Sequence, residues 1–298
     1  MPTFWHDLLG GTVGGVIGMT VVYPLDTVKC RLQTTTRYKG TVDVLTSMIR
    51  KEGVMSWYRG LLSPVAGYGT MFAISFSSYG MAGRYLLRRR QADEGPGGEL
   101  LLWEKSAAGF CAGVCNSPFR VVFERVKSVM QVRRGKELQA PYSWSGACAV
   151  DLVRREGFGM GLFRGMRATT LRESVQCAIY YPSYAVAKDY LIPKDGPKLN
   201  VPEPMLQMIA GGIAGCATWV PPVYFFDVIK TRMQTAEPGV YDGVLDCLMK
   251  TVRAEGVQAL FRGVGVTLLR AIPMHGLVFL GYETTIDFLG ARSDGTNT

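Results

Sequence analysis

The strongest constraint on the fold of this chain is a unit of about a hundred residues that occurs three times. In each unit an acidic residue is followed three residues later by a lysine and seven residues later by a glutamine. These sets are Asp26, Lys29 and Gln33; Glu124, Lys127 and Gln131; and Asp227, Lys230 and Gln234. The acids lie 98 and 103 residues apart. Repetition at a fixed interval indicates a repeat architecture, so we expect three copies of one structural unit.

Shorter motifs recur at similar intervals. Each unit contains a Glu-Gly pair and, a few residues later, an aromatic residue followed by Arg-Gly. The glycines of the first motif are Gly53, Gly157 and Gly256, and the second motif ends in Arg59-Gly60, Arg164-Gly165 and Arg262-Gly263. A tyrosine follows late in each unit, at Tyr79, Tyr184 and Tyr282. We therefore expect three repeats, over residues 1–92, 99–192 and 203–291, joined by charged or proline-rich linkers.

The composition is typical of a membrane protein. Apolar residues make up 48% of the chain, and its mean hydropathy is +0.12. Apolar, glycine-rich stretches cover residues 8–22, 71–87, 206–226 and 264–280. A helix that crosses a bilayer needs about 20 residues of this kind. The first and third repeats each contain two such stretches, and two per repeat predict an all-α membrane protein with six transmembrane helices and both termini on the same side.

Two further features complete each repeat. Glycines spaced by four, such as Gly109 and Gly113, open the first long helix and would let helices approach closely. A short amphipathic stretch follows that helix, over residues 42–50, 147–155 and 244–253. Basic residues gather at its end, so we expect a short helix lying along the membrane surface.

Charge and cysteine usage argue against several functional classes. The net charge of +9 indicates an anionic partner, but the basic residues form no stripe with interleaved aromatics, so we expect anionic lipid and no nucleic acid. The seven cysteines and two histidines show no metal-ligand spacing, so we expect small buried cysteines, no metal and no cofactor. The sequence shows no nucleophile-base set and no phosphate-binding loop, so we do not expect an enzyme. No basic region precedes the first apolar stretch, so we expect no cleavable signal peptide.

The acid and the lysine of each repeat should form ion pairs with neighbouring repeats. A charge inside a bilayer is expensive unless it is paired. Residues three apart on a helix share a face, so each acid and lysine should point toward the axis of the bundle. Threefold pseudosymmetry then predicts the pairs Asp26 with Lys127, Glu124 with Lys230, and Asp227 with Lys29. The alternative is that these pairs simply hold the bundle together permanently.

These motifs resemble the mitochondrial carrier family. The resemblance rests on PLDTVKCRLQ at residues 24–33, the Glu-Gly and aromatic-Arg-Gly pairs and the three repeats, and it covers about residues 4–289. It implies six tilted helices around a central cavity that opens alternately to either side of the inner mitochondrial membrane, with the termini facing the intermembrane space. We expect a monomer. The resemblance assigns the ion pairs to a matrix gate braced by Gln33, Gln131 and Gln234.

The repeats also predict three lipid sites. Helix N-termini with free backbone amides bind phosphate, and the Glu-Gly glycines lie where short helices begin or end. With the Arg-Gly pairs they predict cardiolipin sites between repeats, made by Gly53, Arg59 and Gly60; Gly157, Arg164 and Gly165; and Gly256, Arg262 and Gly263.

The motif of the opposite, cytoplasmic gate is incomplete in this sequence. Carriers place an aromatic-acid-x-x-basic set on the second helix of each repeat. Here the residues that remain are Tyr79, Tyr184, Lys188, Tyr282 and Glu283, and no complete acid-base pair is left. We therefore expect the cytoplasm-open state, held by three matrix-side pairs, to dominate without ligand.

Two arginines mark the expected substrate site. Arg172 and Arg270 each lie eight residues after an Arg-Gly arginine, roughly 12 Å along a helix and so near mid-membrane. An arginine at that depth indicates a functional site, unless it forms a structural ion pair, for instance with Glu124 or the neighbouring Glu173. We assign substrate contact to Arg172, Glu173, Arg270, Gly67, Met71, Ser75 and Glu124.

The same region indicates a small zwitterionic substrate. Arg172-Glu173 resembles the Arg-acid pair of carriers for amino acids and carnitine: an arginine binds a carboxylate and an acid accepts an ammonium. The second helix has no acid between residues 60 and 92, and its small residues, such as Gly67, leave room for an acyl chain. Carnitine or acylcarnitine exchange is the favoured hypothesis. The alternatives are a carrier for ornithine, lysine or arginine, and a carrier-derived membrane scaffold that does not transport.

Overall fold

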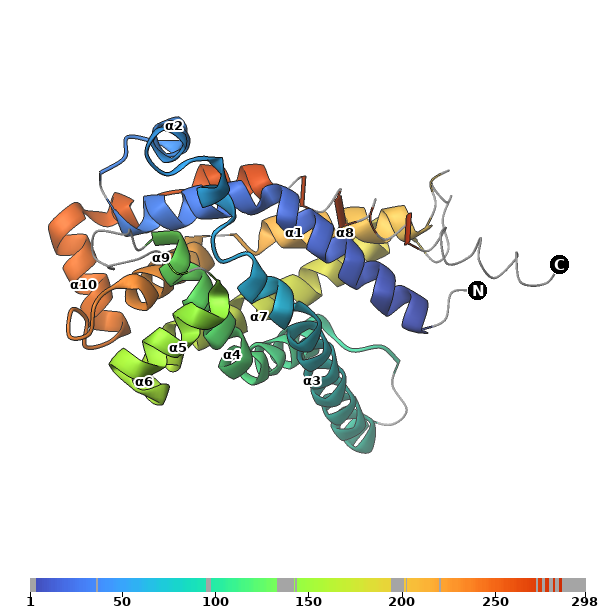
Figure 1. Cartoon of the computed structure of the whole chain (residues 1–298). Helices are drawn as coiled ribbons and strands as arrows, with labels where there is room; N and C mark the ends of the chain where they lie inside the picture. Colours follow the sequence, from blue (N-terminus) through green and yellow to red (C-terminus); the bar gives the residue numbers. More distant parts are fainter. Residues whose placement is uncertain are drawn as a thin grey trace.

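The computed structural model describes residues 4–35, 37–94, 98–132, 142, 144–193, 201, 203–219 and 221–271, and beyond them residues 273, 274, 277, 278, 281, 284 and 285. Over these residues every regular element is a helix (Figure 1). The prediction of an all-α fold is confirmed for this part of the chain.

The order of helices repeats three times. The first repeat contains α1 (Phe4–Thr34), α2 (Thr41–Glu52), the 3-10 helix η1 (Val54–Tyr58) and α3 (Leu62–Glu94). The second contains α4 (Leu102–Val132), α5 (Ser145–Glu156), α6 (Phe158–Phe163) and α7 (Met166–Leu191). The third contains α8 (Glu203–Ala217), α9 (Pro221–Thr235), α10 (Val244–Glu255) and η2 (Val257–Phe261), followed by helical residues 264–271. The predicted short amphipathic helices are thus present as α2, α5 and α10.

The first long helix of the third repeat differs from its counterparts. Pro24 and Pro118 lie inside the continuous helices α1 and α4. In the third repeat the helix is interrupted between α8 and α9, immediately before Pro221-Pro222. Two successive prolines lack two N–H donors, so the helical hydrogen-bond ladder cannot continue through them. Trp219 lies in this interruption.

The repeated glycine motifs adopt the same backbone conformation in each repeat. The glycines that follow α2, α5 and α10 have φ values of 78°, 78° and 80°, at Gly53, Gly157 and Gly256. The Arg-Gly glycines also have positive φ, at Gly60, Gly165 and Gly263. Residues other than glycine adopt such φ values only with strain. The motifs therefore recur because each repeat makes the same two turns.

Each amphipathic helix packs on the end of the long helix before it. Three buried apolar clusters make these contacts: Val28, Leu32, Val44 and Met48; Val126, Val129, Cys148 and Leu152; and Ile229, Cys247 and Leu260. Val266 of the third repeat joins the first cluster, which links the last repeat to the first.

The cysteines are only partly buried. Cys30, Cys148 and Cys247 are buried, as expected, and Cys177 is partly buried. The expectation is wrong for Cys111, Cys115 and Cys216, which are exposed. These three lie on outward faces of α4 and α8 that also expose apolar side chains, among them Phe110, Val114 and Ile213. A thiol behaves as a small apolar group, so an apolar outer face accommodates it as well as a core does.

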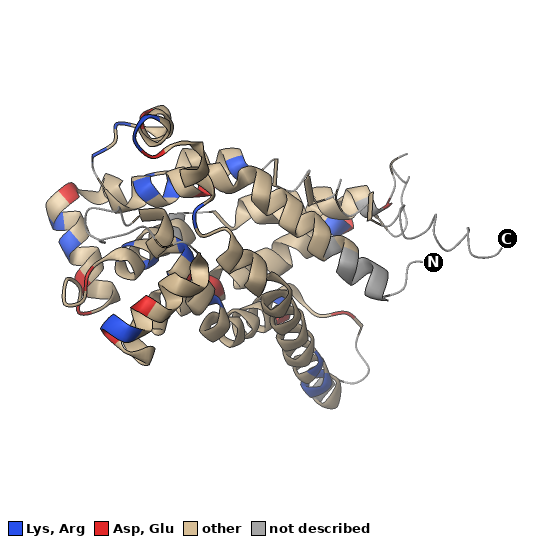
Figure 2. Cartoon of the chain, viewed as in Figure 1, with Lys and Arg blue, Asp and Glu red and all other residues tan. Residues whose placement is uncertain are grey.

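Apolar side chains are exposed along the long helices. On α1, Val13, Ile17 and Val21 are 39%, 41% and 54% exposed, at the four-residue spacing of one helix face. Figure 2 shows that charged residues gather at the end of the molecule that carries α2, α5 and α10, whereas the exposed length of α1 is largely uncharged. In the part of the chain that the structure describes, no helix of 18 residues or more has a stretch apolar enough to cross a membrane.

The predicted close approach of helices at glycines is confirmed for α4. A Cβ atom added to Gly109 would lie 2.5 Å from the carbonyl oxygen of Cys177, and one added to Gly113 would lie 2.6 Å from the Cα of Ser174. Both partners belong to α7. The two helices therefore pack backbone against backbone, which fixes the position of Arg172 and Glu173 next to α4.

Candidate functional site

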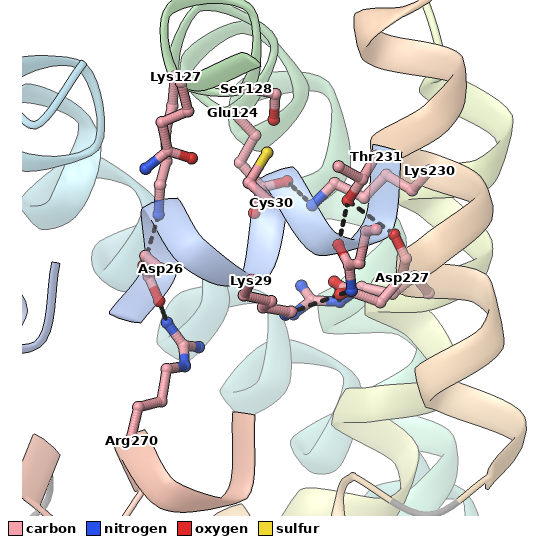
Figure 3. Close-up of a pocket in the computed structure, with 13 residues that line it drawn as sticks. Asp26, Lys29, Cys30, Glu124, Lys127, Ser128, Asp227, Lys230, Thr231 and Arg270 are labelled. Carbon is pink, nitrogen blue, oxygen red and sulfur yellow. Dashed lines mark hydrogen bonds and ion pairs between the residues drawn. The ribbon is translucent and has the colours of Figure 1, made fainter. Parts of the chain in front are cut away.

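The three predicted ion pairs are present. Lys127 Nζ lies 2.6 Å from Asp26 Oδ2, Lys29 Nζ lies 2.7 Å from Asp227 Oδ2, and Lys230 pairs with Glu124. Each pair joins two of the helices α1, α4 and α9, so together they form a closed ring (Figure 3). We call these six residues the ion-pair ring. Its pairing follows the predicted threefold scheme, which is thereby confirmed.

The three glutamines make different contacts. Gln33 donates from Nε2 to Asp227 Oδ2 at 2.9 Å, and its Oε1 accepts a hydrogen bond from Thr231 at 2.9 Å. Gln131 instead donates to Thr27 Oγ1 at 3.1 Å. Gln234 accepts from Ser128 Oγ at 3.2 Å and donates to Thr169 Oγ1 at 3.3 Å. In these hydrogen bonds only Gln33 reaches an ion-pair carboxylate.

The residue four positions after each acid contributes to this difference. Thr231 and Ser128 have hydroxyl groups, whereas the equivalent residue of the first repeat is Cys30. The Thr231 hydroxyl orients the amide of Gln33 toward Asp227. A thiol is a weak hydrogen-bond donor, so Cys30 offers Gln131 no comparable contact.

An arginine also contacts each carboxylate of the ring. Arg270 pairs with Asp26, Arg172 Nε lies 3.5 Å from Asp227 Oδ1, and Arg120 lies 3.7 Å from Glu124 Oε1. The expected substrate arginines therefore rest on the ring in this state. Structural ion pairs, the alternative considered from sequence, are present for both arginines: Arg172 pairs with Glu173, which was named there, and Arg270 pairs with Asp26, which was not.

A cavity of about 80 Å³ lies within this set of charges. Arg172 and Arg270 line it together with all six residues of the ring. These lining residues contribute five cationic groups and three carboxylates, an excess of two positive charges. The cavity is therefore suited to an anionic group of a ligand.

Trp219 is a site residue that the sequence analysis missed. Its ring lies 4.5 Å from Lys29 Nζ, 5.5 Å from the guanidinium carbon of Arg172 and 5.9 Å from that of Arg270. Such distances are those of cation–π contacts. A comparison of the repeats could have found it, because the equivalent residues, eight positions before the acid, are Gly18 and Asn116.

Arg120 is the second residue that was missed. Besides approaching Glu124, its Nε lies 3.0 Å from Glu173 Oε2. The equivalent residues, four positions before the acid, are Val22 and Val223. Arg120 could have been found from the sequence, because it is charged at a position where the other two repeats are apolar.

The expected substrate residues on α3 lie away from this cavity. Gly67, Met71 and Ser75 are not among the residues that line it. Gly67 offers no room for an acyl chain, because a Cβ atom there would lie 2.5 Å from the ring of Phe123. Met71 is buried. The expectation of free space at Gly67 is therefore wrong, since helix packing fills it.

The described residues of the expected cytoplasmic gate border a second, larger cavity. Tyr79, Tyr184 and Lys188 line about 730 Å³ between α3, α7 and α8. The Tyr79 ring stacks on Tyr181 with centroids 3.8 Å apart. Tyr282 and Glu283 lie outside the described residues.

The arginines of the expected lipid sites bind glutamates of the same repeat. Arg59, Arg164 and Arg262 lie 3.0, 3.6 and 2.8 Å from Glu52, Glu156 and Glu255, the acids of the Glu-Gly motif. These glutamates also bind an arginine from the preceding long helix: Arg31, Arg125 and Arg232. In the third repeat the hydrogen bonds from Arg232 lower the pKa of Glu255. The motif therefore ties the amphipathic helix to the bundle.

These features together define a class of protein. Three equivalent helical repeats surround a charged cavity that a ring of interrepeat ion pairs lines, which is the arrangement of a solute carrier. The family model described as "Mitochondrial carrier protein" matches residues 1–90, 98–195 and 200–293. The chain belongs to the mitochondrial carrier family, and its function is solute transport.

Curated relatives match the chain over nearly its whole length. It is 33% identical to the human mitochondrial carnitine/acylcarnitine carrier protein over 295 residues, which covers 95% of this chain and 94% of that protein. It is 32% identical to human solute carrier family 25 member 45 over 295 residues, covering 96% and 99%. It is 33% identical to the rat mitochondrial basic amino acids transporter over 296 residues, covering 97% and 91%. The resemblance noted in the sequence is thereby confirmed.

Proposed function

We propose that this protein exchanges carnitine and acylcarnitines across the inner mitochondrial membrane by alternating access. The observation that carries the proposal is that Arg172 and Arg270, which both line the charged cavity, lie 5.5 and 5.9 Å from one tryptophan ring, Trp219. Such a site offers both halves of the recognition that carnitine requires, one for its carboxylate and one for its quaternary ammonium.

The carboxylate half rests on the arginines. A guanidinium binds a carboxylate through two parallel hydrogen bonds. Arg172 and Arg270 line the same cavity, and the excess positive charge around them favours an anionic group.

The ammonium half rests on Trp219. A trimethylammonium group has no N–H donor and therefore needs no hydrogen-bond acceptor, and aromatic faces bind such groups through cation–π attraction. The human relative named as a carnitine/acylcarnitine carrier supports this substrate. The runner-up is a basic amino acid, which the rat relative and the Arg172-Glu173 pair support.

The membrane arrangement belongs to the same proposal. Six transmembrane helices, two in each of the repeats 1–92, 99–192 and 203–291, would place both termini in the intermembrane space. The exposed apolar face of α1 supports this, because it would lie against lipid. We propose a monomer with cardiolipin at the Glu-Gly and Arg-Gly turns of each repeat, because Gly53, Gly157 and Gly256 cap the N-termini of the short helices η1, α6 and η2, and helix N-termini favour phosphate.

We assign the described conformation to the cytoplasm-open state. The intact ion-pair ring supports a closed matrix side, and the cavity of about 730 Å³ beside Tyr79 and Tyr184 supports an open cytoplasmic side. Binding of substrate to the arginines would draw them from Asp26 and Asp227 and so weaken the ring.

Exchange assays in liposomes test the proposed function. Purified protein should exchange labelled carnitine and acylcarnitine, and should exchange lysine, ornithine and adenine nucleotide far more slowly. Exchange of lysine alone would replace the proposed substrate by a basic amino acid. Absence of exchange with every substrate, from protein that melts cooperatively, would favour the scaffold hypothesis.

Replacement of Trp219 by leucine should slow carnitine exchange by about fivefold or more. The change keeps an apolar side chain but removes the aromatic face, and a cation–π contact contributes about 0.5–1 kcal/mol when exposed and about 2 kcal/mol when desolvated. Initial exchange rates over a range of carnitine concentrations measure it. The control is Trp57→Leu, at a partly buried tryptophan that packs against the cluster of Val28, Leu32, Val44 and Met48. An unchanged apparent KM and rate for Trp219→Leu would remove the ring from the site.

A further inference from the structure

We propose that Arg120 determines the substrate specificity of this carrier by occupying Glu173, so that the site rejects substrates with a primary ammonium group. The inference rests on the proposed function and narrows its substrate class to carboxylates without such a group. Arg120 does not belong to the ion-pair ring. The equivalent positions of the other two repeats carry no arginine.

Glu173 is engaged at both of its oxygens. Arg172 donates to Oε1, and Arg120 Nε lies 3.0 Å from Oε2. The two guanidinium groups come from different helices, α7 and α4. Glu173 itself is only 2% exposed. It is the acid that sequence analysis offers to a substrate ammonium, and in this arrangement both of its oxygens are taken.

A primary ammonium would have to displace one of these arginines. It carries three N–H donors, which need acceptors once the group leaves water. Displacement of Arg120 would remove its nearer carboxylate, at 3.0 Å, and leave it only Glu124 at 3.7 Å. Displacement of Arg172 would break an ion pair in a nearly buried place, which is strongly unfavourable. A trimethylammonium group makes no such demand, since it has no N–H donor.

The charges around the cavity also disfavour a substrate with a primary ammonium group. Each carboxylate of the ring already contacts a lysine and an arginine. The residues lining the cavity carry two positive charges in excess. Lysine and ornithine each carry two positive charges and one carboxylate, so they would add a net positive charge to a cavity that is already positive. Carnitine carries one charge of each sign and adds no net charge.

The repeats themselves indicate the replacement to make. Valine stands at the positions equivalent to Arg120 in the first and third repeats, at Val22 and Val223, so α4 should accept an apolar residue there. Arg120 is also partly exposed, with 30% of its side chain accessible, so its loss leaves little empty space. Arg120→Met keeps the length of the side chain and removes the charge, and Arg120→Lys keeps the charge.

The experiment compares four proteins in liposomes: wild type, Arg120→Met, Arg120→Lys and the control Arg89→Met, which removes an exposed arginine near the end of α3. Labelled carnitine, lysine and ornithine are the probes. We expect Arg120→Met to raise the ratio of lysine to carnitine exchange by about tenfold or more. Arg120→Lys and Arg89→Met should keep the wild-type ratio.

The outcomes separate the two proposals. If Arg120→Met exchanges carnitine but excludes lysine and ornithine as the wild type does, the inference is wrong and the proposed function stands. If the wild type exchanges lysine and not carnitine, the proposed function is wrong as well. If Arg120→Met exchanges nothing, its melting temperature with each probe decides: stabilisation by lysine that the wild type lacks supports the inference, and no such stabilisation overturns it.

Discussion

Replacing Arg270 with alanine should abolish carnitine exchange while the protein still folds. The change removes one of the two guanidinium groups that line the cavity beside Trp219. Truncating one partner of a desolvated charge pair costs about 2–5 kcal/mol, so the exchange rate should fall by at least about 30-fold. The fold should survive because Asp26 keeps its ion pair with Lys127 at 2.6 Å.

Two further variants make this prediction specific. Arg270→Lys keeps the positive charge but loses the planar fork, so we expect it to retain partial exchange with a raised KM. Arg253→Ala removes an exposed arginine of α10 and should exchange carnitine as the wild type does. Liposome exchange rates and melting curves measure all three. An Arg270→Ala protein that exchanges carnitine normally would exclude this residue from the site.

Replacing Asp227 with asparagine should destabilise the closed state and open the matrix side of the carrier. Asp227 binds Lys29 at 2.7 Å and also lies 3.5 Å from Arg172, and all three side chains are largely buried. Removing one partner of a buried ion pair costs about 3–5 kcal/mol, because the other charge remains without compensation. We expect the melting temperature to fall by about 10 °C.

The labelling rate of Cys30 distinguishes a gate from a permanent brace. This thiol is buried and lines the cavity of the ion-pair ring. If the ring is a gate, Asp227→Asn should speed the reaction of Cys30 with a matrix-side thiol reagent, measured on its own peptide by mass spectrometry. A lower melting temperature with unchanged Cys30 labelling would instead support a permanent structural role.

A double replacement provides the matched control. Lys29→Met combined with Asp227→Asn removes both charges of one pair, so no lysine is left buried without a partner. Arg172 still binds Glu173 in this variant. The double variant should therefore melt at a higher temperature than Asp227→Asn alone. Equal or lower stability would show that Lys29 and Asp227 are not energetically coupled.

Repetition in the sequence was sufficient to predict the ion-pair ring. Asp26 and Lys29 share one helix face because they are three residues apart, and the same spacing recurs in each repeat. Three equivalent helices around an axis leave few ways to pair their charges, so pairings such as Asp26 with Lys127 followed from symmetry alone. The glycines at the repeated turns, such as Gly53, were predictable for a similar local reason: each turn requires a positive φ.

The residues that distinguish the site are those that break the repetition. Trp219 stands where the other repeats carry glycine and asparagine, and Arg120 stands where they carry valine, so the repeated pattern assigns neither residue a role. Their contacts join helices far apart in sequence, as when Arg120 of α4 reaches Glu173 of α7. The space expected at Gly67 is likewise filled by Phe123 from another helix.

The sequence by itself therefore determined the family, the three helical repeats and the charge pairing of the ring. Only the tertiary structure decided that two arginines engage Glu173 and which aromatic ring lies beside the cavity arginines. The physical reason is that periodicity describes one helix at a time and symmetry relates only equivalent residues. Contacts between non-equivalent side chains, such as Arg172 with Trp219, depend on how the helices pack.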